Sequence, residues 1–443
     1  MQVRVSDLID RNPLSGFQLR IIAICALVTL LDGVDIQAMS VVAPTISSEW
    51  GVPASVLGPV LSATFAGITV GAMLFGVMGD RFGRKIVLLG SFALVGLMSL
   101  LTSFVNSPTE MLILRFLTGL GIGGALPNAT ALTAEYAPAS KRVFLITAMY
   151  CGVPLGASAV AFLSPMLIEM FSWRAVFIVG GVLPLLLSLA IIWGLPESAR
   201  FIVAKGGDPR KVAAILEKID RTYKYDPSHT FVVDHEVKGN SVANLFKEHR
   251  ALLTIGLWLV FFSSFFGFYI LTSWLPVIFT EADWPRAAAL RTIAVFQLGV
   301  VFGALSCGWL IDRSKAFLVL GVYYFLASLI VLGVGALASS MGAVMALMVV
   351  AGAAFGGAQV CIVAVAANVY PTNARSTGVG WALGAGRTGA VISPIIAGFA
   401  IAAEWETQAV FALSAVPALI CAALCIMLLV NERMKTRAAA ARL

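Results

Sequence analysis

The sequence has few charges. Only 12% of its 443 residues are Asp, Glu, Lys or Arg, whereas 59% are hydrophobic and the mean hydropathy is +0.94. Because about a quarter of the residues of a soluble domain are charged, this composition excludes a soluble globular protein. The chain instead contains about twelve apolar runs long enough to cross a bilayer as helices. We therefore expect an all-α membrane protein with twelve transmembrane helices.

Histidine and metal-ligand patterns are scarce as well. All three histidines fall in one polar stretch outside the apolar runs, which excludes a histidine proton relay within the membrane (His229, His235 and His249). The six cysteines lie inside apolar runs without metal-site spacing, so we expect small buried residues. No nucleophile–base or metal-ligand constellation is recognisable. We expect no enzymatic activity, no cofactor and no bound metal.

The net charge of +7 follows the membrane rather than a nucleic acid. If the N-terminus is cytoplasmic, about 25 of the 30 Lys and Arg residues fall on the inner side, and the outer loops are acidic. The first apolar run is too long for a cleaved signal peptide and lacks a small-residue cleavage site. We predict a multi-pass protein of the plasma membrane with both termini cytoplasmic and no nucleic-acid partner.

The apolar runs form two similar halves. A polar stretch at 196–250 separates residues 1–195 from residues 251–443, and Lys211–Ile219 within it has the pattern of a short amphipathic helix. Asp80-Arg81 recurs as Asp312-Arg313, at a spacing close to that between Arg142 and Arg375. We predict two six-helix bundles joined by a cytoplasmic linker, with a substrate site between them at the midplane.

Two carboxylates interrupt the first apolar run. Asp32 and Asp35 stand within the otherwise apolar stretch Ile21–Ala43, and their spacing puts them on one face of a helix. An Asp near the middle of a membrane helix costs about 3 kcal/mol on insertion scales. We therefore expect both to face the bundle interior or a water-filled path.

Two arginines stand inside later apolar runs. Arg115 lies about 9 Å into the fourth run, at a depth similar to that of the two aspartates, so we predict that it faces them, either directly or through substrate and water. A permanent structural ion pair is the alternative. Arg387 lies near the middle of the eleventh run among glycines, where a planar guanidinium could bind a substrate carboxylate.

Uncharged polar side chains in the spans complete the candidate site. The seventh run is rich in aromatic residues, and Tyr269 could stack on an aromatic ring while its hydroxyl forms a hydrogen bond. Asn128 and Gln297 could bind substrate or hydrogen-bond between helices, and the sequence leaves both options open.

Three motifs resemble those of the major facilitator superfamily: Gly76–Lys85 in the loop after the second run, Arg115–Gly123 in the fourth, and Pro196–Phe201 after the sixth. The stretch Asp32–Gly51 further resembles the aspartate motif of the aromatic acid:proton symporters, the family of 4-hydroxybenzoate and protocatechuate transporters. This resemblance implies the major facilitator fold in a bacterial inner membrane.

The charged loops after the second and eighth runs are candidates for gating. Opposite charges there can hold the inner face closed in one state and separate in the other, and Gly83 permits a tight turn. The candidate gating residues are Asp80, Arg81, Gly83, Arg84, Asp312 and Arg313. A solvated loop without a switching role is the alternative.

The sequence thus predicts a proton-coupled carrier that imports a small aromatic carboxylate by alternating access. Asp32, Asp35 and Arg115 would couple protons, Arg387 would bind the carboxylate, and the proton gradient would replace a cofactor. We expect a functional monomer surrounded by lipid, with a small organic acid and H⁺ as its partners. A symporter of a non-aromatic organic acid and a proton-coupled exporter are the alternatives.

Overall fold

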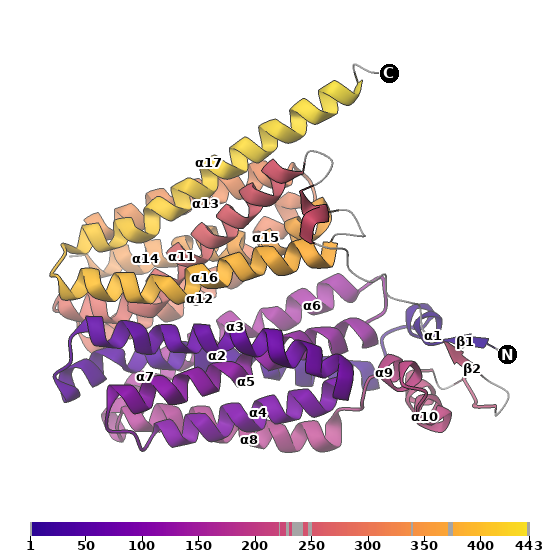
Figure 1. Cartoon of the computed structure of the whole chain (residues 1–443). Helices are drawn as coiled ribbons and strands as arrows, with labels where there is room; N and C mark the ends of the chain where they lie inside the picture. Colours follow the sequence, from indigo (N-terminus) through magenta and orange to yellow (C-terminus); the bar gives the residue numbers. More distant parts are fainter. Residues whose placement is uncertain are drawn as a thin grey trace. The chain divides into compact units, whose positions relative to one another are not determined.

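The structure is a computed structural model (Figure 1). It describes residues 2–220, 222–226, 230–232, 242–246, 250–337, 340–370 and 375–440. The three histidines of the polar stretch lie outside the described residues. The described chain forms two compact units, each built from segments that are distant in sequence.

Unit 1 comprises residues 1–36, 66–156 and 174–236. Its complete helices and strands are β1 (Gln2–Arg4), α1 (Val5–Arg11), α4 (Arg84–Thr102), α5 (Pro108–Tyr136), α6 (Arg142–Tyr150), α9 (Ala199–Ala204), α10 (Pro209–Ile219) and β2 (Thr230–Val232). It also holds nearly all of α8 (Trp173–Gly194) and parts of α2 (Gly16–Trp50), α3 (Ala54–Phe82) and α7 (Gly152–Met170).

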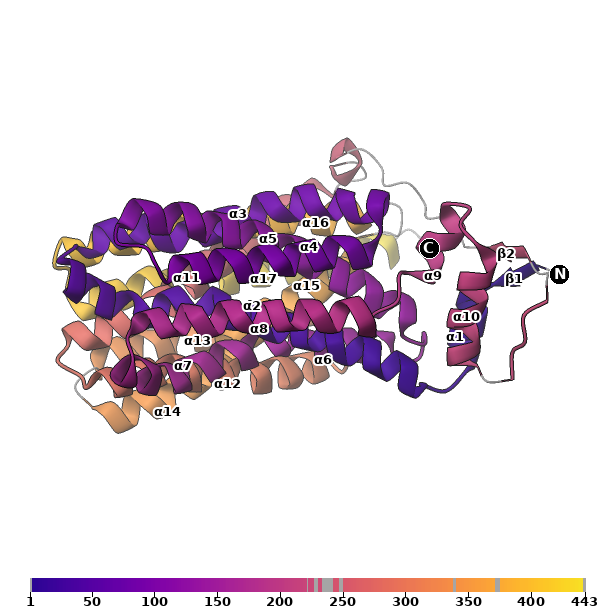
Figure 2. The same ribbon diagram turned by 90° about the horizontal axis from the view of Figure 1, so that it is seen from below.

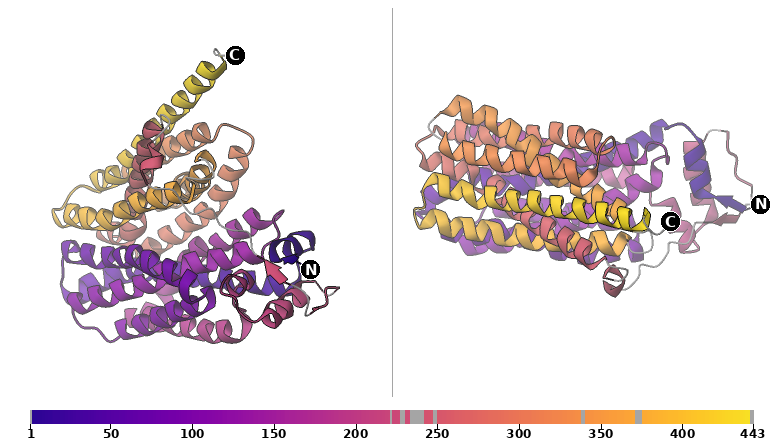
Figure 3. Two further views of the ribbon diagram at one scale, coloured as in Figure 1. Left: turned by 45° about the vertical axis from the view of Figure 1, so that its right-hand side comes forward. Right: turned by 90° about the horizontal axis from the view of Figure 1, so that it is seen from above.

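Unit 2 comprises residues 37–65, 157–173 and 237–443, and so takes the remaining parts of α2, α3 and α7. Its other elements are η1 (Val242–Leu245), α11 (Ala251–Glu281), α12 (Arg286–Ile311), α13 (Ala316–Ala336), α14 (Met341–Ala351), η2 (Gly352–Gly356), α15 (Gly357–Val369), α16 (Arg375–Ala402) and α17 (Thr407–Ala440). Helix α17, which ends at the C-terminus in Figure 3, packs along α13 and α11.

The membrane-spanning character predicted from composition is confirmed. Among the described residues, eleven helices are long and apolar enough to cross a membrane, and α2 meets the same criterion only together with α1, which is bent from it by 98°. Between 44% and 67% of an apolar 18-residue stretch of each of the eleven is buried. Many of the remaining residues are large, apolar and exposed, as with Trp193 and Phe104, which suits contact with lipid rather than water.

Part of the described polar stretch between the halves packs against the N-terminal segment. The predicted amphipathic helix is present as α10, and Asp208 caps its start by accepting a hydrogen bond from the Arg210 amide. Its apolar face is buried, and it packs beside α1. Strands β1 and β2 pair in parallel, with Val3 opposite Phe231 (Figure 2). These contacts join that part of the stretch to the N-terminal segment within unit 1.

Glycines set the distance between α2 and α7 in unit 1. A Cβ atom at Gly33 would lie 2.0 Å from the Val153 carbonyl oxygen, and one at Gly156 would lie 1.8 Å from that of Leu30. Since no heavier residue fits at either position, the two backbones touch, as is common between membrane helices. This contact fixes the turn of α2 that carries both aspartates.

We predict that Gly156→Ala destabilises the protein by about 1–3 kcal/mol, because the added methyl group forces α7 away from α2. Gly90 in α4 is the matched control, since a Cβ there meets no atom within 4 Å, and Gly90→Ala should be neutral or slightly stabilising. Thermal unfolding of both purified variants in detergent measures the difference. An unchanged melting temperature for Gly156→Ala would contradict this packing.

Candidate functional site

Helix α2 buries both aspartates of the first apolar run. The side chains of Asp32 and Asp35 are 0% and 1% exposed, and no other charged residue lies between Arg20 and Glu49. The two carboxylates share a helix turn but have different surroundings.

Asp35 forms a buried ion pair with Arg115 of α5, the arginine that was predicted to face it. The Nη1 atom of Arg115 lies 3.2 Å from Oδ1 of Asp35, and the Arg115 side chain is fully buried. Ser99 of α4 donates a hydrogen bond of 2.7 Å to the same carboxylate oxygen. An oppositely charged partner and a hydroxyl donor compensate for part of the cost of removing the carboxylate from water.

The rest of the Arg115 environment was not predicted. Its Nη2 atom donates to Ser99 at 3.2 Å and to Thr102 at 2.7 Å, and its guanidinium lies 4.7 Å from the centre of the Phe177 ring. Ser99 and Thr102 are three residues apart and so share one face of α4. That spacing was a signal in the sequence, although hydroxyl residues are common in spans.

Asp32 is placed differently. Among the residues that the structure describes, neither of its carboxylate oxygens has a hydrogen-bond partner, and the ion pair of Arg115 goes to Asp35 rather than to Asp32. Arg115 therefore meets only one of the two acids that it was predicted to face. A charged carboxylate buried without partners is very unfavourable, so Asp32 is the less stable of the two as an anion.

Arg387 and Tyr269 come together within unit 2. Arg387 is half-buried in α16, and its charge acts on Tyr269 of α11. A Cβ atom at Gly386 would lie 3.0 Å from the Phe265 ring, so the backbone beside Arg387 touches an aromatic residue. The Tyr269 ring lies 4.4 Å from that of Phe65 and 5.9 Å from that of Phe265. The cation thus stands beside a cluster of aromatic rings.

The two uncharged polar candidates have different partners. Gln297 of α12 donates to the side-chain oxygen of Gln37 at 3.4 Å, and both are buried. Asn128 instead donates to the backbone carbonyls of Gly124 at 2.8 Å and Phe75 at 3.4 Å. Its amide therefore connects α5 to α3, which is the interhelical option that the sequence left open.

Gly83 and Arg84 lie in a charge cluster at the junction of α3 and α4. Arg84 is 3.1 Å from Asp80 and 3.4 Å from Glu135, and Ser198 donates a hydrogen bond to Glu135. Gly83 has a positive φ of 104°, as a tight turn requires. The Asp80 side chain is 77% exposed, so its pair with Arg84 contributes little to stability.

Glu197, which was not predicted as a site residue, caps α4 in this cluster. Its Oε1 atom accepts hydrogen bonds from the backbone amides of Arg84 at 2.9 Å and Lys85 at 3.3 Å. A carboxylate at a helix N-terminus interacts favourably with the helix dipole. A Cβ atom at Gly83 would lie 2.3 Å from Glu197 Oε2, so the glycine also makes room for this cap.

The corresponding positions of the second half have other contacts. The Arg313 guanidinium lies 4.0 Å from the centre of the Trp309 ring, and Asp312 is exposed. Neither residue forms an ion pair with another residue in the described ranges. Arg81, in the first half, lies over its neighbour Phe82. The charge cluster of the first half is therefore not repeated among the described residues.

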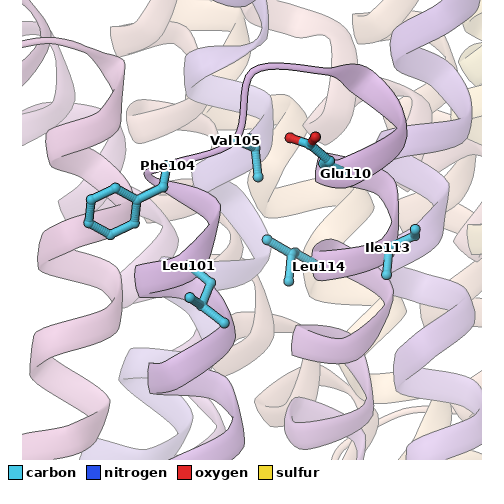
Figure 4. A pocket seen from close by; sticks show the side chains of 6 residues that line it. All are labelled: Leu101, Phe104, Val105, Glu110, Ile113 and Leu114. Carbon is cyan, nitrogen blue, oxygen red and sulfur yellow. The ribbon is translucent and has the colours of Figure 1, made fainter.

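A surface hollow lies where α4 ends and α5 begins, and it offers no binding site for an organic anion. It is lined by Leu101, Phe104, Val105, Glu110, Ile113 and Leu114 (Figure 4). The one carboxylate there, Glu110, already accepts a hydrogen bond of 3.1 Å from the backbone N–H of Asn106. An organic anion would find no cation in this lining.

In the described part of the chain, no cluster of three His, Cys, Asp or Glu side chains could hold a metal.

We predict strong coupling between Asp35 and Arg115. Asp35→Asn and Arg115→Gln should each destabilise the protein by about 3–5 kcal/mol, because each leaves the other charge buried alone. The double variant should be more stable than the sum of the single effects predicts. A double-mutant cycle on thermal unfolding in detergent measures this coupling, and strictly additive effects would contradict the pair.

The comparisons with known proteins identify the family of the chain. The family model described as Major Facilitator Superfamily matches residues 25–380 and 293–442. The 4-hydroxybenzoate transporter PcaK of Pseudomonas putida is 38% identical over 94% of this chain and 93% of its own length. The gallate transporter of Pseudomonas putida is 35% identical over 94% and 93%.

Among solved structures, the D-xylose-proton symporter superimposes with a TM-score of 0.72 over 93% of this chain and 97% of its own, at 16% identity. That likeness shows the fold alone. The sequence relatives are transporters rather than enzymes and match nearly the whole length. The chain therefore belongs to the Major Facilitator Superfamily and is a multi-pass membrane transporter related to the aromatic acid carriers.

Proposed function

We propose that this protein imports a small aromatic carboxylate together with protons by alternating access. The observation that carries the proposal is the buried pair of Asp35 and Arg115, one helix turn from Asp32, whose carboxylate has no hydrogen-bond partner among the described residues. Intramembrane acids of this kind mark proton and substrate pathways. The relatives named for 4-hydroxybenzoate and gallate support an aromatic acid as the substrate.

The substrate carboxylate is assigned to Arg387. A guanidinium offers two parallel donors that match a carboxylate, and Arg387 is only half-buried. The rings of Phe265 and Tyr269 lie close by, where they can stack on an aromatic substrate. Anion and ring would thus be bound by neighbouring groups of α16 and α11.

Asp32 is assigned as the group that carries the proton. Its charged form has no partner among the described residues, so the protonated form is favoured while the site is closed to water. Asp35, by contrast, is held as an anion by Arg115 and Ser99. Protonation of Asp35 would release Arg115, which would then be available to the substrate anion. Coupling follows if the carrier changes state only when these charges balance.

The remaining assignments follow the same proposal. Asp80, Arg81, Gly83 and Arg84, with Asp312 and Arg313 in the second half, would stabilise one closed state of the inner face. The protein would work as a monomer in a bacterial inner membrane, with both termini in the cytoplasm. The proton gradient would supply the energy without a cofactor.

Uptake measurements test the proposal. Cells producing the protein should accumulate labelled 4-hydroxybenzoate, and a protonophore should abolish the accumulation because the proton gradient drives it. Asp32→Asn and Asp35→Asn should each lose accumulation, whereas Asp7→Asn, at an exposed site in α1, should keep it. Full accumulation by Asp32→Asn would contradict its role as the proton carrier, and full accumulation by Asp35→Asn would contradict the part of the Asp35–Arg115 pair in coupling. Net efflux would show an exporter, and uptake of aliphatic acids alone would show a different substrate class.

Arg387 has a separate test. Arg387→Gln should raise the KM for 4-hydroxybenzoate about 10- to 100-fold, because a hydrogen bond to a charged group contributes about 1.5–3 kcal/mol. Competition by the uncharged amide of the same acid should be unaffected. Arg286→Gln, at an exposed cation at the start of α12, is the control. An unchanged KM in Arg387→Gln would remove this residue from the site.

A further inference from the structure

Two glutamine side chains from different spans form a buried amide pair. Gln37 of α2 and Gln297 of α12 are 2% and 6% exposed, and the Nε2 atom of Gln297 donates to Oε1 of Gln37 at 3.4 Å. Both belong to unit 2. Each carboxamide can make up to four hydrogen bonds, so the pair has more capacity than this single contact uses.

The position of the pair is fixed by a proline in α11. Pro276 has no backbone N–H, so it leaves the carbonyl of Thr272, four residues earlier, without its helical donor. Gln37 donates to this carbonyl at 2.8 Å, and Ser40 also lies 2.8 Å from it. Side chains of a neighbouring helix thus satisfy the backbone group that the proline freed.

The pair retains unused hydrogen-bonding groups. Within the described chain, the side-chain oxygen of Gln297 has no hydrogen-bond partner, and each Nε2 atom uses one of its two hydrogens. The Gln297 oxygen is not one of the fully buried polar atoms without a partner in the described chain, so it keeps some accessible surface at which a ligand can reach it. One acceptor and two donors therefore remain for a ligand that brings a hydroxyl group.

The pair lies next to the aromatic cluster beside Arg387. Tyr269 precedes Thr272 by three residues, so the two share one face of α11. The centre of the Tyr269 ring lies 4.4 Å from that of Phe65 and 5.4 Å from that of Phe268. Tyr269 also interacts electrostatically with Arg387 of α16, and the amide pair is bound one turn further along α11, at the Thr272 carbonyl. A hydroxylated aromatic acid carries an anion, a ring and a hydroxyl group, which match the cation, the aromatic rings and the amide pair.

We propose that the Gln37–Gln297 amide pair recognises the ring hydroxyl of the transported aromatic acid and selects hydroxylated acids over unsubstituted ones. This inference rests on the proposed function. The phenolic O–H would donate to the Gln297 side-chain oxygen and accept from an amide N–H. An acid without the hydroxyl leaves these buried groups unpaired, which is how sites reject analogues that lack a hydrogen-bonding group.

The test compares 4-hydroxybenzoate with benzoate as substrates. The wild-type protein should have the lower KM for 4-hydroxybenzoate. Gln297→Met, which keeps the length of the side chain and removes its amide, should raise that KM about tenfold, the equivalent of one neutral hydrogen bond. The KM for benzoate should change little. Ser40→Ala is the matched control, because it alters the contact with Thr272 and keeps the amide pair.

Each outcome decides a different claim. If the wild-type protein transports neither acid, the proposed function fails. If it transports both, but Gln297→Met leaves the ratio of the two KM values unchanged, this inference is contradicted and the proposed function is not. A loss of preference in Ser40→Ala equal to that in Gln297→Met would assign the effect to helix packing and overturn the inference. Thermal stabilisation of the wild-type protein by each acid gives a readout independent of the variants, and equal stabilisation would also overturn it.

Discussion

The structure depends on how charge is compensated inside an apolar environment. A lone carboxylate or guanidinium within a membrane span is unfavourable by several kcal/mol, so each one needs a partner, a proton or a ligand. Asp35 and Arg115 meet this constraint by pairing with each other and with hydroxyls of α4. Asp32, one turn away, has no hydrogen-bond partner among the described residues. It would therefore need a proton or a ligand. That contrast between two acids of one motif is the basis of the proposed proton coupling.

Backbone contacts make the contrast possible. Gly33 lies between the two aspartates and touches the backbone of α7 at Val153, so this turn of α2 has little freedom to rotate. The aspartates therefore keep different neighbours although they share a helix face. In α11 another backbone feature has a similar effect, since Pro276 frees the Thr272 carbonyl that holds Gln37 in place. In both places a residue that destabilises the helices of soluble proteins, a glycine or a proline, positions a polar group within a span.

The sequence predicted those features that follow from the cost of burying charge. Apolar runs and sparse charges indicated the spans, and a lone Arg115 at the depth of Asp35 indicated their pairing. The amphipathic helix α10 and the positive-φ turn at Gly83 also followed from local pattern. The roles assigned to these residues in coupling and gating stay predictions.

Neutral polar contacts were harder to predict, because their energies are small and their residue types are common. Thr102 illustrates this, since its hydroxyl bonds back to Met98 in its own helix as well as to Arg115, and nothing in its spacing distinguishes the two uses. The cap that Glu197 places on α4 joins residues over a hundred positions apart. Strands β1 and β2 have three residues each, too few for a periodic pattern. Gln37 was missed because it is uncharged, although Pro276 was a signal that a carbonyl near it needs a donor.

The most direct test of the central claim is the protonation state of the two acids. Infrared difference spectroscopy of the purified protein in lipid, with and without substrate, reports the carbonyl stretch of a protonated carboxylic acid. The account predicts such a band without substrate, lost in Asp32→Asn and kept in Asp35→Asn. A band that disappears only in Asp35→Asn, or no protonated carboxyl group sensitive to Asp32, would contradict it.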